Sequence, residues 1–217
     1  MRKWHAVLLL GPTGSGKSPL GDQLERDGLW GRRCVHFDFG ASLRAADQGS
    51  RRGDDGNAPG EELAAADLTV IRASLATGAL LENEDFPIAA RILKRFASVR
   101  RLTADDLLIL NGFPRHAGQA RDLESLADMS AVISLEGPVD VIRERIRRDA
   151  GGDREGRPDD SPGDVENKLR IYAERTLPLA AFYRERGVPI FAVPVGVTTQ
   201  PREIVRYLDE LRSQVTS

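Results

Sequence analysis

A glycine-rich stretch that follows a short apolar run is the part of this sequence best equipped for chemistry. Residues 11–18 read Gly-Pro-Thr-Gly-Ser-Gly-Lys-Ser, directly after the apolar residues 6–10. Glycines let successive backbone N–H groups point inward, and with the positive end of the helix that follows they form a phosphate pocket. Lys17 would reach the β- and γ-phosphate oxygens of a nucleoside triphosphate, and the Ser18 hydroxyl is placed to bind Mg²⁺. We therefore predict a nucleoside triphosphate site formed by Gly11, Thr13, Gly14, Ser15, Gly16, Lys17 and Ser18.

The size, charge and cysteine content of the chain limit what kind of protein can carry this site. Its 217 residues suffice for one well-buried α/β core but not for two ordinary domains. A net charge of −2 gives no general attraction to nucleic acid or to an anionic membrane, so we expect neither as a partner. A single cysteine rules out a disulfide framework and argues against a zinc knot. The five apolar residues before Gly11 are too few for a signal peptide or a membrane span, which favours a cytoplasmic location.

Five short apolar segments are predicted to be strands. They are separated by helical patterns, which indicates an α/β fold with a parallel sheet and crossover helices on both faces. We expect the strands at residues 4–10, 34–37, 107–110, 131–135 and 188–193.

Three apolar patterns with helical spacing lie in the C-terminal half. The first begins after Pro138 and is expected to turn Arg143, Arg147 and Arg148 away from the core. The second spans residues 165–183, with a kink expected at Pro178 because proline interrupts helical hydrogen bonding. The apolar positions of the three patterns are Val139, Ile142 and Ile146; Val165, Leu169, Tyr172, Leu179 and Tyr183; and Ile204, Leu208 and Leu211.

Two polar, glycine-containing stretches interrupt these patterns. Residues 48–60 hold no large apolar side chain, and we expect an exposed loop there. Residues 149–164 have a similar composition and also carry Arg157, which is typical of a mobile lid that delivers charge to a site. A solvated connector is the favoured interpretation of residues 48–60 and the alternative for residues 149–164.

Two further segments resemble the adenylate kinase family, in that family's order and approximate spacing. The first, Phe39-Gly40-Ala41-Ser42-Leu43-Arg44, is similar to the turn into the helix that binds the monophosphate. The second, Leu110-Asn111-Gly112-Phe113-Pro114-Arg115 followed by Gln119, is similar to the family's Asp-Gly-Phe-Pro-Arg segment and its base-reading glutamine. The resemblance implies an acceptor site formed by Phe39, Arg44, Gly112, Arg115 and Gln119, and a cis peptide between Phe113 and Pro114.

A third segment looks like the family's lid edge and the helix that follows it. It comprises Gly156-Arg157-Pro158-Asp159-Asp160 and then the stretch that begins at Lys168. The resemblance implies that Arg157 and Lys168 contact the transferring phosphoryl group, that Arg145 lies near the donor base, and that Arg147 or Arg148 adds a phosphate contact. Arginine suits these roles because its planar fork grips phosphate through two hydrogen bonds. We count Lys17, Arg115, Arg157, Arg148 and Lys168 as candidate catalytic residues.

The sequence also departs from the family pattern. Asn111 and Ala41 stand where the family has aspartates, so two carboxylates that would hold magnesium-bound water are missing. Ser18, in place of a glycine, and the nearby Asp38 offer metal ligands instead. Phe39 replaces a threonine that contacts the acceptor base, and Lys168 replaces an arginine.

Taken together, these features favour a nucleoside monophosphate kinase that transfers the γ-phosphoryl group of Mg·ATP and works in nucleotide biosynthesis. We expect one monomeric P-loop kinase domain over residues 1–217, with a helical acceptor lobe at about 40–98 and a short lid at about 149–164. Two alternatives stay open. One is a P-loop kinase for another small phosphorylated or hydroxylated metabolite, and the other is a nucleotide-binding regulatory protein with little or no transfer activity.

Overall fold

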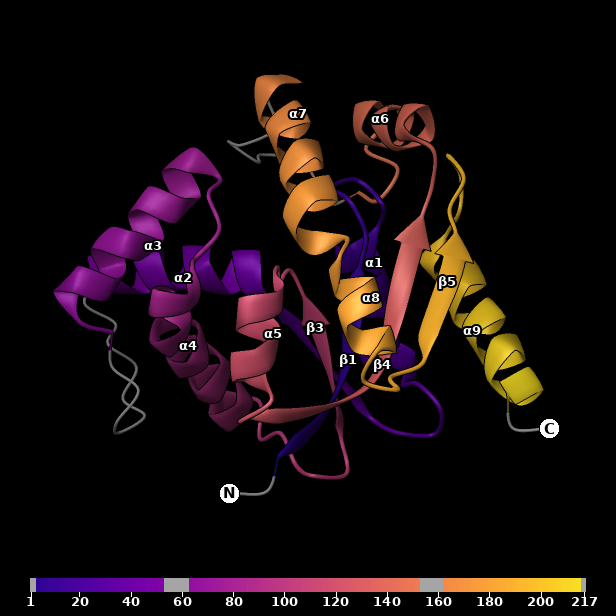
Figure 1. The fold of residues 1–217 in the computed structure, drawn as a ribbon, viewed down its shortest axis with the longest axis horizontal. Helices are drawn as coiled ribbons and strands as arrows, with labels where there is room; N and C mark the ends of the chain where they lie inside the picture. The colour runs from indigo at the N-terminus through magenta and orange to yellow at the C-terminus, as the bar shows by residue number, and fades with distance from the viewer. Residues whose placement is uncertain (1–2, 53–62, 153–161, 216–217) are drawn as a thin grey trace.

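A five-stranded parallel sheet forms the centre of the molecule (Figure 1). The structure, a computed structural model, describes residues 3–52, 63–152 and 162–215. The strands are β1 (Trp4–Leu10), β2 (Cys34–Asp38), β3 (Leu107–Asn111), β4 (Ala127–Glu136) and β5 (Ile190–Pro194). They lie in the order β2-β3-β1-β4-β5, and every neighbouring pair is parallel. The carboxyl ends of all five strands therefore meet at one edge of the sheet, as the predicted fold class requires.

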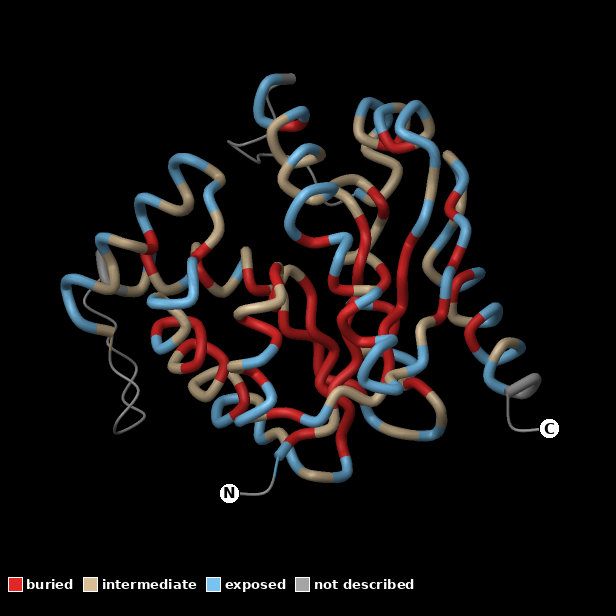
Figure 2. The backbone as a smooth tube through the Cα atoms, viewed as in Figure 1, coloured by how far each residue is buried: buried red, intermediate tan, exposed pale blue. Residues whose placement is uncertain are grey.

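The central strand β1 is buried on both faces, and its side chains alternate between two apolar clusters. Ala6, Leu8 and Leu10 enter one cluster, whereas Val7 and Leu9 enter the other. Helices α4 (Phe86–Val99), α5 (Ala117–Leu123) and α8 (Leu179–Arg184) pack on the first face, while α1 (Lys17–Asp27), α6 (Val139–Arg147) and α9 (Pro201–Val215) pack on the second. Figure 2 shows the resulting band of buried backbone along the strands.

The described residues between β2 and β3 form three helices, in the region where an acceptor lobe was predicted. They are α2 (Phe39–Arg52), α3 (Ala65–Thr77) and α4, with the short 3₁₀ turn η1 (Asn83–Asp85) before α4. Ion pairs tie the lobe together, because Arg72 of α3 binds Asp47 of α2 and Arg91 of α4 binds Asp67 of α3, each at 2.6 Å.

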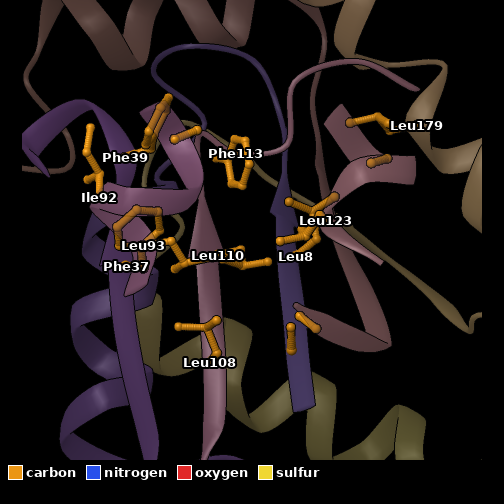
Figure 3. Packing of buried hydrophobic residues seen from close by; sticks show 14 of the residues in the cluster. Leu8, Phe37, Phe39, Ile92, Leu93, Leu108, Leu110, Phe113, Leu123 and Leu179 are labelled. Atoms are coloured by element: carbon orange, nitrogen blue, oxygen red, sulfur yellow. The ribbon is translucent and has the colours of Figure 1, made fainter. Parts of the chain in front are cut away.

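Aromatic side chains join this lobe to the sheet. Phe39, at the start of α2, lies between Phe37 of β2 and Phe113, with ring centroids 6.0 and 5.1 Å away. Figure 3 shows these rings beside Ile92 and Leu93 of α4 and above Leu110 of β3. The Phe113–Pro114 peptide bond is cis, as the resemblance implied.

The structure corrects three expectations about element boundaries. α2 continues to Arg52, so residues 48–52, expected in a loop, are helical; Gln and Arg are good helix formers even without apolar neighbours. β5 begins at Ile190 rather than at 188, because the Val188 N–H bonds to Tyr183 O and Pro189 has no N–H for a strand ladder. β4 begins four residues earlier than expected, at Ala127, and its pairing with β1 is irregular between Ala6 and Val7.

Two helical patterns also differ from expectation. Val139 was expected in the core but is 54% exposed on the first turn of α6. The pattern at residues 165–183 is not one kinked helix, because it divides into α7 (Pro162–Ile171), the π-helical turn η2 (Tyr172–Thr176) and α8. The Leu177 N–H reaches back five residues to Tyr172 O, and Pro178 then starts α8. The final helix is as predicted, with Ile204 and Leu208 buried.

Cys34, at the start of the edge strand β2, is 1% exposed, and burial raises the pKa of its thiol to about 12.

None of the described helices is both long and apolar enough to cross a lipid bilayer.

Candidate active site

One cavity at the carboxyl edge of the sheet gathers most of the predicted site residues. Its lining comes from the loop before α1, from the start of α2, from the end of α3 with the loop to Leu81, from residues 111–119, and from α7 with η2. Figure 1 shows α3 and α7 standing on either side of this edge. The predicted residues that line it are Gly11, Thr13, Gly14, Gly16, Lys17, Ser18, Phe39, Arg44, Gly112, Arg115, Gln119, Arg145 and Lys168.

The glycine-rich loop adopts backbone conformations that only glycine takes easily. Gly14 and Gly16 have φ values of 80° and 100°, in the region that disfavours a Cβ. A Cβ on Gly14 would also lie 2.4 Å from Ile146 of α6. Ser15 differs from its neighbours because its side chain is fully buried and does not line the cavity. The predicted role of Ser15 could therefore involve only its backbone.

Two cations hold the shape of this loop. Lys17 Nζ donates to Gly11 O at 2.6 Å and to Pro12 O at 2.7 Å, so its ammonium lies across the loop. Arg145 is 4% exposed and donates to Gly14 O at 3.1 Å and to Gly196 O at 2.6 Å. Arg145 was expected beside the donor base. It lines the cavity, but its hydrogen bonds also join the loop to the segment after β5.

Arg115 lines the cavity and is fixed through its backbone. Gln119 Oε1 accepts from the Arg115 N–H at 2.8 Å, and the Thr176 hydroxyl donates to Arg115 O at 2.9 Å. Burial lowers the pKa of the Arg115 guanidinium to about 10, so it remains protonated at neutral pH. In the part of the chain that the structure describes, neither Arg115 nor Arg44 has a carboxylate partner. Two arginines that form no ion pair among the described residues and line one cavity are suited to bind an anion.

The predicted base-reading side of the cavity is largely apolar. Phe39 is 5% exposed and Gln119 is 1% exposed. Both ends of the Gln119 amide already bind backbone, because Nε2 donates to Leu81 O at 2.8 Å while Oε1 binds Arg115. Each residue lines the cavity as predicted, but each also has a structural role.

The structure does not bring Arg148 to the cavity. Its exposed guanidinium is paired with Glu144 on the same helix, as is that of Arg147. The two charges lower the pKa of the Glu144 carboxyl to about 2 through direct hydrogen bonds. Lys168 of α7 does line the cavity. Arg157 and most of the predicted lid fall outside the described residues.

Oxygen atoms suited to a magnesium ion meet beside Lys17. The Ser18 hydroxyl donates to Asp38 Oδ2 at 2.8 Å, and Asn111 Nδ2 lies 3.0 Å from both oxygens. Because the Ser18 proton is directed to Asp38, a lone pair of Ser18 Oγ remains for a metal. Hydroxyl and carboxylate oxygens are ligands that Mg²⁺ prefers, so these residues fit the ion.

Several cavity residues were not predicted as site residues. Tyr172 and Thr176 line it from η2, and residues 78–81 line it after α3. Thr176 stands in the segment that resembles the family's lid helix, which was the available signal. The short loop after α3 has no chemical signature, since it contributes mainly main chain and apolar side chains.

This fold and cavity define the class of P-loop kinases. The gluconokinase from Sinorhizobium meliloti 1021 has a TM-score of 0.53 with this structure over 99% of this chain and 98% of that one, at 21% sequence identity, which bears on the fold alone. No protein-family model matches the chain.

Comparison with known sequences identifies the family. The chain is 31% identical over 198 residues to the adenylate kinase of Xylella fastidiosa strain M23, covering 88% of this chain and 91% of that relative. It is 32% identical over 190 residues to the adenylate kinase of Xanthomonas campestris pv. campestris strain B100, covering 83% and 86%. The chain belongs to the adenylate kinase family, and these relatives are kinases, which are phosphotransferases.

Proposed function

We propose that this protein is a nucleoside monophosphate kinase that transfers the γ-phosphoryl group of Mg·ATP to a nucleoside monophosphate. The observation that carries the proposal is the single cavity in which Lys17 of the phosphate loop shares a lining with Arg44 and Arg115. The names of the sequence relatives agree with a nucleotide acceptor.

The chemistry follows from the charges of the cavity. An oxygen of the acceptor phosphate attacks the γ-phosphorus, the bond from that phosphorus to the β-bridging oxygen breaks, and two diphosphates result. A loose transition state spreads negative charge over the transferring group, so positioned cations contribute more than a covalent nucleophile. Lys17 would contact the donor phosphates, Arg44 the acceptor phosphate, and Arg115 the region between them. Arg157 and Lys168 would add charge from the lid side.

Magnesium would be held by Ser18 and Asp38. When bound with ATP, the ion neutralises and orients the β- and γ-phosphates. Asn111 keeps the two oxygens together by donating to both.

A coupled assay tests the proposal. Purified protein, Mg·ATP and a panel of nucleoside monophosphates are compared with hydroxyl acceptors such as gluconate and with no acceptor. We expect diphosphate formation only with a monophosphate. Arg115→Ala should lower kcat/KM by about 100- to 1,000-fold, because one preorganised donor to a developing charge is lost.

Arg206→Ala is the matched control, since Arg206 is exposed on α9 and does not line the cavity. It should retain wild-type activity, with circular dichroism confirming that both variants fold. Transfer only to a hydroxyl acceptor, or nucleotide binding without transfer, would contradict the proposal.

A further inference from the structure

A buried histidine lies behind the proposed magnesium ligands. His36 is on β2, and its side chain is 4% exposed. Because strand side chains alternate, His36 faces α1 as Cys34 does, and Asn111 of β3 faces the same way as Ile109. His36 and Asn111 therefore meet under the first turns of α1.

Hydrogen bonds fix which nitrogen of His36 carries a proton. Nδ1 lies 2.8 Å from Asp22 Oδ1, and a carboxylate only accepts, so Nδ1 is the donor. Asn111 Nδ2, which can only donate, lies 3.4 Å from Nε2, so Nε2 is the acceptor in this contact.

The Asn111 amide has two N–H groups and three neighbours. One N–H points toward His36 Nε2, and the other is shared by Ser18 Oγ and Asp38 Oδ2, each at 3.0 Å. A flipped amide would place its oxygen against the Asp38 carboxylate, which would be repulsive. His36 and Asp38 thus hold the amide in one orientation from opposite sides.

The first helix makes room for this histidine. A Cβ on Gly21 would lie 2.3 Å from His36 Nε2 and 2.5 Å from Cε1. Any larger residue at position 21 would displace the ring, so Gly21 and His36 form a matched pair.

We propose that His36, oriented by Asp22, is a positioning residue that fixes the Asn111 amide and thereby holds Ser18 and Asp38 for a divalent cation bound with the nucleotide. This inference rests on the ATP-binding part of the proposed function. In metal sites, residues one step behind the ligands commonly change metal affinity by about 10- to 100-fold.

Equilibrium binding of a non-hydrolysable ATP analogue tests the proposal without any turnover. The Kd of adenylyl imidodiphosphate is measured by calorimetry in EDTA and in saturating Mg²⁺. The Kd in EDTA divided by the Kd in Mg²⁺ reports how much the metal strengthens binding. We expect His36→Leu to reduce this ratio by about tenfold while the Kd in EDTA changes by less than about twofold.

Three further variants separate positioning from general damage. His36→Gln keeps an acceptor at the distal position and should restore most of the ratio. Gly21→Ala keeps the imidazole but displaces it, and should behave like His36→Leu. His5→Leu, at the opposite end of the sheet, should match wild type.

The outcomes are distinguishable. An unchanged ratio in both His36→Leu and Gly21→Ala would overturn the positioning role, as would a wild-type ratio of one. Absence of analogue binding in wild type under both conditions would overturn the proposed function itself. If circular dichroism shows that His36→Leu does not fold, the ratios of Gly21→Ala and His36→Gln test the positioning role instead.

Discussion

At Asn111 a neutral amide stands beside the carboxylate of Asp38, with 3.0 Å between Asn111 Nδ2 and Asp38 Oδ2. The resemblance to the family places an aspartate at this position. In this chain the carboxylate lies one strand away, at the end of β2, and the amide donates to it. The arrangement keeps one negative charge near the phosphate loop without two carboxylates in contact.

Restoring the aspartate should therefore change stability and metal response in opposite directions. In Asn111→Asp, two carboxylates about 3 Å apart repel when no cation is bound, so the Tm in EDTA should fall by several degrees. Mg²⁺ with the ATP analogue should raise the Tm of this variant more than that of wild type. Thermal denaturation monitored by circular dichroism measures both effects.

Asn111→Leu separates charge from hydrogen bonding, because it loses the amide without adding a carboxylate. Its Tm in EDTA should fall below that of wild type, and Mg²⁺ with the ATP analogue should raise its Tm less than that of wild type, because the amide that holds Ser18 and Asp38 together is lost. If Asn111→Asp were as stable in EDTA as wild type, the placement of the Asp38 carboxylate beside position 111 would be wrong.

At the scale of elements, Arg145 connects three parts of the site. It belongs to α6, it donates to Gly14 O of the phosphate loop, and it donates to Gly196 O, Val197 O and Thr199 O after β5. Because one side chain donates to four backbone carbonyls, it fixes the phosphate loop relative to α6 and to the segment after β5.

Replacing Arg145 should cost both stability and nucleotide affinity. Arg145→Met leaves these carbonyls without their donor, and we expect the free energy of unfolding to fall by about 2–3 kcal/mol. Urea denaturation measures this change. Arg145→Lys should recover little of it, because an ammonium cannot reproduce the planar fork. A Lys variant as stable as wild type would show that only the charge matters.

The sequence predicted the elements better than their ends. The predicted bounds of β1, residues 4–10, are those observed, because an apolar run before a glycine-rich turn is unambiguous. The start of β4 was missed because Asp128 and Ser130 break its apolar pattern. The π-helical turn could not be predicted, since the hydrogen bond from Leu177 to Tyr172 O depends on how η2 packs against residue 115.

At the scale of the whole molecule, an ion pair joins the helical region between β2 and β3 to η2. Arg175 of η2 binds Glu82 through two hydrogen bonds, at 2.8 and 3.2 Å, and Glu82 lies directly after the cavity-lining loop. His116 Nε2 is 3.9 Å from the same carboxylate. The hydrogen bonds from Arg175 lower the pKa of the Glu82 carboxyl below its usual 4.5.

This contact should give a pH-dependent contribution to stability. Because the folded-state pKa is lowered, the stabilisation is present above pH 4.5 and is lost as the pH falls through the folded-state value. Both side chains are partly exposed, so Glu82→Gln should cost at most about 1 kcal/mol at pH 7. Denaturation at pH 7 and pH 3 measures the difference in the free energy of unfolding between wild type and Glu82→Gln, which should be smaller at pH 3. An equal difference at both values would show that the carboxylate charge is not responsible.

The site as a whole was predictable only where a motif marked it. Residues 11–18, Arg44 and Arg115 were found because their neighbours in sequence define their role. Arg148 was placed in the site by the family resemblance, without a motif of its own around it, and the structure pairs it instead with Glu144, one turn earlier on the same helix. The apolar wall near Gln119 comes from helices that meet only when the lobe folds onto the sheet.

The edge position of β2 gives this chain a built-in chemical reporter. Cys34, its sole thiol, begins the strand that carries His36 and ends at Asp38, and the folded state shields it from reagents. The rate at which a thiol reagent modifies Cys34 therefore reports how often the fold opens around the start of β2, and it can be measured without an added label.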